Sequence, residues 1–117
     1  MSDDCVFCKI SLGIIPSKKL YENDSFFVIS DINPIADGHI LVISKKHYEN
    51  ILTMPVSLGM EFLEAIKNVS ETMIKEHGAD GFNVILNTAP AAGQIVFHVH
   101  AHIIPRKDGD GLKILGK

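Results

Sequence analysis

The stretch His98-Val99-His100-Ala101-His102-Ile103-Ile104-Pro105-Arg106 places three histidines at alternating positions. Successive side chains of a β-strand point to opposite faces, so the histidines share one face and the apolar residues between them share the other. The alternation therefore predicts a half-buried strand with a core face and an imidazole face. Imidazole titrates near neutral pH and binds metals, so the row is a candidate nucleophile, acid–base pair or metal site.

A purely structural role is the alternative for these histidines. A single histidine in a strand is usually a hydrogen-bonded residue without chemistry. Three adjacent imidazoles differ, because nearby like charges disfavour the protonation of at least one of them. Crowding polar groups without a task is costly, which favours the functional interpretation.

Length and charge limit the classes of protein to consider. The 117 residues suffice for one domain and not for two, so we expect a single domain over residues 1–117. A formal net charge of −3 and a pI of about 6.0 argue against a nucleic-acid partner. The sequence contains neither a signal-peptide pattern nor an apolar run of membrane-spanning length. We therefore expect a cytoplasmic protein with no membrane partner.

Hydrophobic periodicity and turn residues predict the secondary structure. A helix over 6–12 should end at Gly13, and a long helix should begin near Pro55 and end at Gly78. Strands are expected over 18–21, 25–29, 39–43, 82–87 and 95–104. This order predicts a long helix packed on an antiparallel sheet.

Residues outside the histidine row also suggest phosphate chemistry. The loop over 88–94 brings Gly93 and Gln94 next to the row, where an unobstructed backbone can donate N–H groups to a phosphate. The basic pairs Lys45-Lys46 and Arg106-Lys107 are either phosphate-attracting groups or solvated strand ends.

The two cysteines, Cys5 and Cys8, have the two-residue spacing that lets both thiolates bind one tetrahedral zinc ion. A redox pair and two unlinked buried thiols are the alternatives. The histidine row itself is a further candidate, as the ligand set of a catalytic zinc that activates water. In the last possibility, the histidines of the row have different roles: one completes a structural zinc site, and its neighbour attacks an electrophile.

The pattern over residues 98–104, histidine-apolar-histidine-apolar-histidine-apolar-apolar, resembles the motif of the histidine triad (HIT) family. Further similarities to that family extend along nearly the whole chain. In order, they are Phe7-Cys8-Lys9-Ile10, Ile15-Pro16, Asp31-Ile32, Gly38-His39, Lys45-Lys46-His47, Asn87, Gly93-Gln94 and Pro105-Arg106.

This resemblance implies an α+β fold with a five-stranded antiparallel sheet, one long helix and one short helix. It also implies a homodimer whose sheet continues across both subunits. The activity it implies is hydrolysis or transfer at the α-phosphorus of adenosine phosphoramidates or dinucleoside polyphosphates, with release of a nucleoside monophosphate. The substrate partner would then be a purine nucleotide.

The resemblance assigns roles to individual residues. His100 matches the nucleophile that forms a nucleotidyl-histidine intermediate. His102 matches the contact to the phosphate or leaving group, and His39 belongs to the surrounding histidine network. The catalytic candidates are thus His100, His102 and His39. The nucleotide-binding candidates are Phe7, Ile10, Ile29 and Ile32 at the base, Asp31 at the ribose, and Asn87, Gly93, Gln94, His98, His100 and His102 near the phosphates.

Zinc-binding relatives use a cysteine pair, a histidine after a strand and the first histidine of the triad. The matching positions are Cys5, Cys8, His47 and His98, so the resemblance implies a structural zinc site. One position departs from the family pattern: Ile95 stands where a serine or threonine hydroxyl usually assists the leaving group. This departure favours phosphoanhydride cleavage over phosphoramidate hydrolysis, and it also motivates the alternative of a catalytically weak nucleotide-binding or signalling module.

Overall fold

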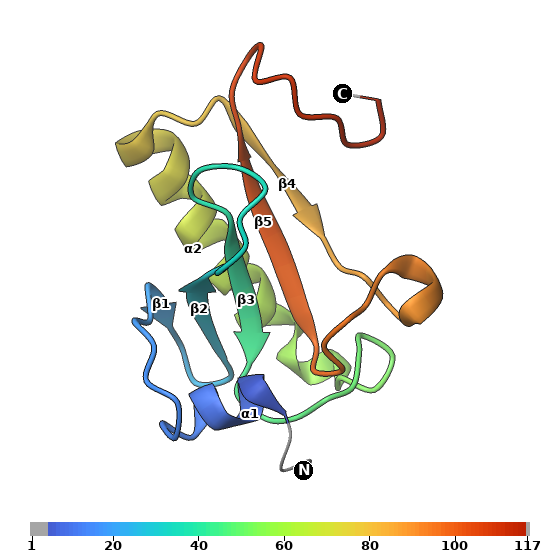
Figure 1. Cartoon of the computed structure of the whole chain (residues 1–117). Coiled ribbons are helices and arrows are strands. Elements are labelled where there is room, and N and C mark those ends of the chain that lie inside the picture. Colours follow the sequence, from blue (N-terminus) through green and yellow to red (C-terminus); the bar gives the residue numbers. More distant parts are fainter. Residues whose placement is uncertain (1–4, 117) are drawn as a thin grey trace.

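Five strands form one antiparallel sheet in the order β1-β2-β3-β5-β4 (Figure 1). The computed structural model describes residues 5–116, with β1 at Tyr21–Glu22, β2 at Phe26–Ser30, β3 at Ile40–Ser44, β4 at Gly81–Ile85 and β5 at His100–Arg106. The helices are the short α1 at Val6–Ser11 and the long α2 at Gly59–His77, with 3₁₀ turns η1 at Val56–Leu58 and η2 at Pro90–Ala92. The predicted α+β class and five-stranded antiparallel sheet are confirmed. No helix within the described range has the length and apolarity needed to cross a bilayer.

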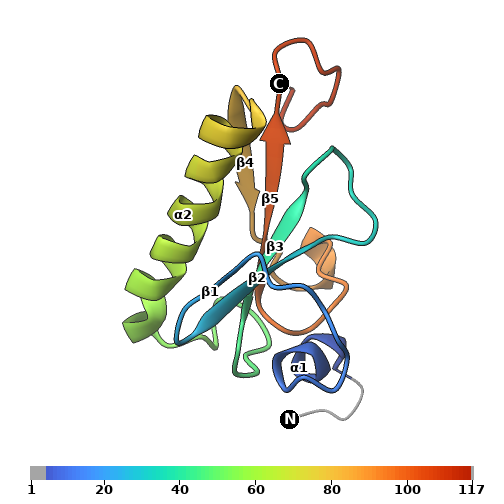
Figure 2. The same ribbon diagram turned by 90° about the vertical axis from the view of Figure 1, so that its left-hand side faces the viewer.

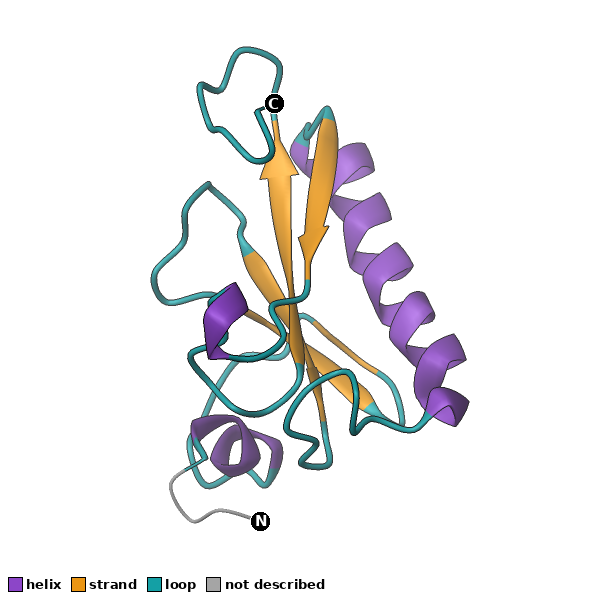
Figure 3. Ribbon diagram, turned by 90° about the vertical axis from the view of Figure 1, so that its right-hand side faces the viewer, coloured by secondary structure: helices purple, strands orange, loops and turns teal. Residues whose placement is uncertain are grey.

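The two helices cover opposite faces of the sheet, as the two side views show (Figures 2 and 3). Strands β2 and β3 are buried on both faces, which explains their uninterrupted apolar sequences. The core under α2 contains Phe26, Val28, Ile40, Val42, Ala65, Val69, Met73, Ala79, Ala101 and Ile103. The core under α1 contains Cys5, Phe7, Cys8, Ile10, Phe27, Ile29, Leu41 and Ile43. The alternation predicted for the histidine strand is confirmed, because Ala101 and Ile103 lie on the α2 side.

The prediction of a strand over 95–104 is wrong in its first half. Residues 96–98 form a bend, and β5 runs instead from His100 to Arg106. The carbonyl of His98 lies 2.7 Å from Nδ1 of His100, and the N–H of Val99 donates to Tyr48 instead of a neighbouring strand. These bonds replace the regular ladder, so only two of the three histidines belong to β5.

Helix α2 begins later than predicted, because the 3₁₀ turn η1 occupies the first positions after Pro55. Its end is at the predicted place. Gly78 adopts a left-handed conformation with φ +72°, and its N–H donates to the carbonyl of Met73. Glycine is favoured there because it has no Cβ to clash in this conformation.

We predict that Gly78→Ala lowers the free energy of unfolding by about 1 kcal/mol, because alanine is strained in the left-handed region. Gly59→Ala is the matched control, since Gly59 has a helical φ and a Cβ there would meet nothing within 4 Å. That control should leave stability unchanged or raise it by about 0.5 kcal/mol. Urea unfolding measures both variants, and equal effects of the two would contradict the explanation.

Candidate active site and metal centre

His98 is fully buried in the bend before β5, and both of its ring nitrogens have partners. Its Nε2 lies 2.7 Å from the carbonyl oxygen of Ser44 at the end of β3. A carbonyl only accepts hydrogen bonds, so Nε2 carries the ring proton and Nδ1 carries a lone pair. That lone pair faces the sulfur atoms of Cys5 and Cys8, at 3.3 and 3.4 Å. His98 is thereby prepared as a ligand through Nδ1.

The two cysteines sit at the start of α1, where the helix turn brings their sulfur atoms together. The backbone N–H of Cys8 donates to Sγ of Cys5, an interaction that stabilises a thiolate. Sγ of Cys8 lies 3.2 Å from Nδ1 of His47, which follows β3. The ligand atoms of Cys5, Cys8, His47 and His98 all lie within 4.8 Å of one another. The structure thus brings together the four residues that the sequence predicts as one cluster.

The donor set suits a tetrahedral zinc ion. Zinc binds sulfur at about 2.3 Å and imidazole nitrogen at about 2.05 Å, so tetrahedral geometry separates an S and an N ligand by about 3.5 Å. The measured S···N separations of 3.2 to 3.4 Å are close to that value. Burial raises the pKa of the Cys8 thiol to about 11, and the hydrogen bond with Cys5 adds to the effect. A nearby cation would offset this cost and favour the thiolate.

His100 is positioned for a different task. Its Nδ1 lies 2.7 Å from the carbonyl oxygen of His98, so Nδ1 donates and Nε2 holds the lone pair. The ring packs edge-on against Phe7, with centroids 5.0 Å apart, and the residue is 8% exposed. Burial lowers the pKa of His100 and keeps the ring neutral at pH 7. A neutral imidazole with a fixed Nε2 lone pair is a competent nucleophile.

His102 and His39 form a second hydrogen-bonded group with Asp31. The backbone N–H of Ile35 donates to Nδ1 of His39, so Nε2 of His39 carries the ring proton. That Nε2 lies 3.0 Å from Nδ1 of His102 and 3.4 Å from a carboxylate oxygen of Asp31. His102 therefore accepts at Nδ1 and carries its own proton at Nε2.

Burial is the main cause of the lowered pKa values of His39, His102 and His98. It lowers the pKa of His39, and the Asp31 carboxylate opposes that shift. It lowers the pKa of His102 to about 4, with His100 and His39 adding to the shift. It also lowers the pKa of His98 to about 4, although its bond to Ser44 acts in the opposite direction. These three rings, like that of His100, are neutral at pH 7.

Some of the residues predicted to contact the base of the nucleotide are buried in the core, and one is exposed at the surface. Phe7, Ile10 and Ile29 are buried in the core under α1, while Ile32 is 92% exposed. Asp31 follows β2, and one of its carboxylate oxygens accepts the N–H of Asn33. A carboxylate has further lone pairs, so Asp31 can accept from two additional donors.

The loop before β5 is braced by Gln94, which the sequence predicts near the phosphates. Its side-chain oxygen accepts the N–H of Ala89, and its Nε2 donates to the carbonyls of Glu49 and Val96. Gly93 has φ +93°, and a Cβ there would lie 3.7 Å from the amide nitrogen of Asn87. The Gln94 side chain therefore shapes the loop. The N–H groups of Gly93 and Gln94 donate to the carbonyls of Pro90 and Ala89, so these two groups are not free to bind a phosphate as the sequence predicts.

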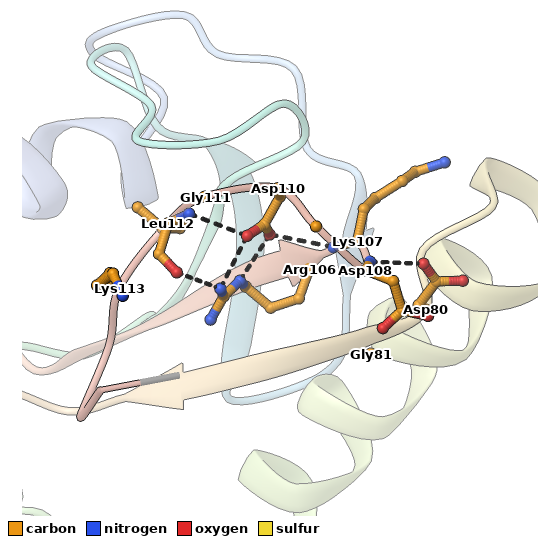
Figure 4. A pocket seen from close by; sticks show the side chains of 10 residues that line it. Asp80, Gly81, Arg106, Lys107, Asp108, Asp110, Gly111, Leu112 and Lys113 are labelled. Atoms are coloured by element: carbon orange, nitrogen blue, oxygen red, sulfur yellow. Dashed lines mark hydrogen bonds and ion pairs between the residues drawn. The ribbon is translucent and has the colours of Figure 1, made fainter.

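One residue of each basic pair, Lys45 and Arg106, forms an ion pair with an acidic side chain. Arg106 lies at the far end of β5, where its guanidinium binds the carboxylate of Asp110, with Nε···Oδ2 at 2.8 Å (Figure 4). This pair lines a hollow of about 430 Å³ that contains none of the histidines. Lys45 pairs with Glu22 at 2.8 Å. For Lys45 and Arg106, these ion pairs favour the strand-end interpretation.

Two contributors to the site carry no signal in the sequence. Ser44 holds His98 through its backbone carbonyl and its hydroxyl, and Ile35 holds His39 through its backbone N–H. Backbone groups are present at every residue, so only the position of these groups in the fold gives them a role.

Residues 13–109 match the family model of the HIT domain. The chain belongs to the HIT family. It is 44% identical over 112 residues to an adenylylsulfatase of Arabidopsis thaliana, a match that covers 96% of this chain and 57% of that protein. It is 37% identical over 108 residues to an adenosine 5'-monophosphoramidase of Candida albicans, covering 89% of this chain and 71% of that protein.

A solved structure of a zinc-bound HIT family protein from Mycobacterium smegmatis has the same fold, with a TM-score of 0.87 and 35% identity. The superposition covers 97% of this chain and 83% of that one. Named relatives in the family are thus nucleotide hydrolases, and this chain contains a cysteine–histidine cluster whose donor atoms suit a metal ion.

Proposed function

We propose that this HIT protein cleaves purine nucleotides at the α-phosphorus through a covalent intermediate on His100 and releases a nucleoside monophosphate. The proposed substrates are adenosine phosphoramidates or dinucleoside polyphosphates. The observation that carries the proposal is the 2.7 Å hydrogen bond between Nδ1 of His100 and the His98 carbonyl. It fixes the proton on Nδ1 and leaves Nε2 free to attack.

The proposed reaction has two steps. Nε2 of His100 attacks the α-phosphorus, an N–P bond forms, and the leaving group departs. The ring becomes cationic, and the His98 carbonyl stabilises it by accepting its Nδ1–H. Water then attacks the same phosphorus, the N–P bond breaks, and His100 regains its lone pair. Nε2–H of His102 is a candidate to bind the charged phosphoryl oxygens.

Substrate binding is assigned to the surrounding residues. Asp31 has lone pairs for the two ribose hydroxyls. We assign the apolar contact for the base to Phe7, Ile10, Ile29 and Ile32, of which only Ile32 is exposed. The names of the relatives support an adenine nucleotide, since one is an adenylylsulfatase and another an adenosine monophosphoramidase.

We predict that His100→Ala forms no nucleotidyl adduct and loses at least about 10⁴-fold in turnover. Intact-protein mass spectrometry after a rapid acid quench, with a fluorogenic adenosine phosphoramidate and with diadenosine polyphosphate, tests this. His77→Ala is the control, because His77 is exposed at the end of α2. Full turnover by His100→Ala would refute the nucleophile. Tight nucleotide binding without adduct or monophosphate in the wild type would indicate the binding-module alternative.

We further propose that Cys5, Cys8, His47 and His98 hold a structural zinc ion. A zinc-bound structure in the family and the S₂N₂ donor set support this assignment. The ion would supply a crosslink between α1, the end of β3 and the bend before β5. We place the protein in the cytoplasm, where thiols remain reduced and available to zinc.

Cys8→Ser should lower the zinc content from about one equivalent per chain to near zero, because a serine hydroxyl is a poor zinc ligand. It should also lower the melting temperature, since the crosslink is lost. His77→Ala should keep its zinc. Metal analysis and thermal unfolding measure these effects. Retention of zinc in Cys5→Ser or Cys8→Ser would favour a zinc held by the histidine row instead.

We propose a homodimer that continues the sheet through β4. This strand is at the sheet edge, so its outer N–H and C=O groups are open to pairing. Phe82 and Val84 pair with Pro105 and Ile103, which places their side chains on the α2 side of the sheet. Both are partly exposed, as are Leu63 and Ile74 on one flank of α2. A second copy would cover this apolar surface.

Val84→Lys should convert the dimer to a monomer, because it places a charge in the proposed apolar interface. Light scattering coupled to size-exclusion chromatography gives the mass in solution. Leu12→Lys is the control, since Leu12 is 60% exposed just after α1, away from β4. A monomeric wild type at micromolar concentration, or equal effects of the two variants, would contradict this interface.

A further inference from the structure

We propose that Cys5 and Cys8 are a redox-modification site that controls the nucleophile. Oxidation by a peroxide joins the two sulfur atoms in a disulfide, removes both sulfur ligands from the metal cluster and weakens nucleotide cleavage, and reduction reverses these effects. The effect on cleavage rests on the proposed function of His100, whereas the formation of the disulfide does not depend on it. Disulfides in a reducing compartment are usually transient and redox-sensing.

The two thiols are placed to react with each other. Both are free in the structure, and their sulfur atoms lie 3.3 and 3.4 Å from the same atom, Nδ1 of His98. Cys5 is the N-cap of α1 and Cys8 lies in its first turn, a spacing that separates the two Cα atoms by about 5 Å. Disulfides span Cα separations of roughly 4.4 to 6.8 Å. The bond can therefore form without unwinding α1.

The two cysteines differ in the way that an attacking thiol and a resolving thiol differ. Cys5 is 9% exposed, whereas Cys8 is 3% exposed. The backbone N–H of Cys8 donates to Sγ of Cys5, which stabilises negative charge on that sulfur and keeps Cys8 beside it. Redox-sensing cysteines combine thiolate character with a neighbouring cysteine that resolves the oxidised form. We therefore assign the reaction with the oxidant to Cys5 and the closure of the disulfide to Cys8.

The proposed oxidation has two steps. The Cys5 thiolate attacks one oxygen of hydrogen peroxide, the O–O bond breaks, and a sulfenic acid and hydroxide form. Sγ of Cys8 then attacks Sγ of Cys5, an S–S bond forms, and the sulfenic oxygen leaves as water with the proton of the Cys8 thiol. The hydroxide takes up the proton that Cys5 released. Overall, two thiols lose two electrons and two protons, and the peroxide becomes two molecules of water.

The disulfide is incompatible with the metal cluster. Two thiolates on one tetrahedral zinc ion are about 3.8 Å apart, whereas bonded sulfur atoms are about 2.05 Å apart. The thiolate is the metal ligand, and a disulfide sulfur no longer carries its charge. Of the four donors in the cluster, only His47 and His98 remain after oxidation. The proposed zinc ion should therefore be released.

His98 transmits the change from the cysteines to the nucleophile. Its ring is fully buried, and the two sulfur atoms are the only hydrogen-bond partners that the described residues offer to its Nδ1. A disulfide has no proton to donate to this lone pair, and a buried acceptor without a partner is unfavourable. The backbone carbonyl of the same residue accepts the Nδ1–H of His100 at 2.7 Å. Any shift of His98 toward a new partner therefore disturbs the alignment of His100.

The experiment treats the zinc-loaded protein with hydrogen peroxide and follows its intact mass, the zinc released to a chromogenic chelator, and the cleavage of an adenosine phosphoramidate. We expect each chain to lose about 2 Da and to release its zinc. Cleavage should fall by about tenfold, as for the loss of a group that orients a reactive histidine. Dithiothreitol with added zinc should restore all three quantities.

Cys5→Asp separates the disulfide from the metal. Aspartate binds zinc and is a favoured N-cap residue, which is the position of Cys5 in α1. This variant has no disulfide to form, so peroxide should leave its zinc content and its cleavage rate at their untreated values. Met60→Leu is the control for methionine oxidation, because Met60 is 75% exposed. It should respond to peroxide as the wild type does.

The outcomes separate this inference from the proposed function. If peroxide leaves both thiols intact, or if the disulfide forms without loss of cleavage, the inference is overturned and the proposed function stands. If the untreated protein cleaves no nucleotide, the proposed function fails, and the ring of His100 still reports the coupling. Its Nδ1–H should give a proton NMR signal protected by the bond to His98 in the reduced protein and lose that protection on oxidation. An unchanged signal in the disulfide form would contradict the inference.

Discussion

The buried His98 imidazole is the contact on which the rest of the site depends. Its Nε2–H ties the bend before β5 to the last residue of β3, and its Nδ1 faces the two sulfur atoms of α1. Leaving either nitrogen without a partner in a fully buried position would cost about 1–3 kcal/mol. Its backbone carbonyl in turn fixes the ring of His100. One residue thereby links the cysteine cluster, two strands and the proposed nucleophile.

The backbone gives three chemically identical histidines three different hydrogen-bonding environments. Carbonyl oxygens set the tautomers of His98 and His100, and a backbone N–H sets that of His39, which then sets that of His102. Since a backbone N–H cannot accept and a carbonyl cannot donate, each assignment has a fixed direction. Burial reinforces it by keeping the rings neutral. The proposed difference between a metal ligand, a nucleophile and a hydrogen-bond donor therefore follows from the fold.

The sequence predicts the class of the fold well, because its signals are periodic and local. Alternation along residues 98–104 identifies the core face of β5, and the pair Pro55 and Gly78 brackets α2 to within a few residues. The bend at His98 is not predictable in this way, since it depends on a hydrogen bond from Val99 to Tyr48, far away in the chain.

The same distinction applies to the site. The resemblance to the HIT family indicates which residues gather, and the structure does bring the four predicted zinc ligands together. The sequence cannot indicate that the side-chain amide of Gln94 is hydrogen-bonded to backbone groups, or that Arg106 binds Asp110 at the far end of its strand.

The alternation along β5 also determines on which faces of the sheet the proposed dimer surface and the histidines lie. Ala101 and Ile103 pack under α2 while His100 and His102 face the opposite side, so the proposed assembly surface and the chemistry lie on different faces of one sheet. A second copy added at β4 would leave the histidine face open, and β4 would connect it to the site through its pairing with β5 and through the loop that follows β4.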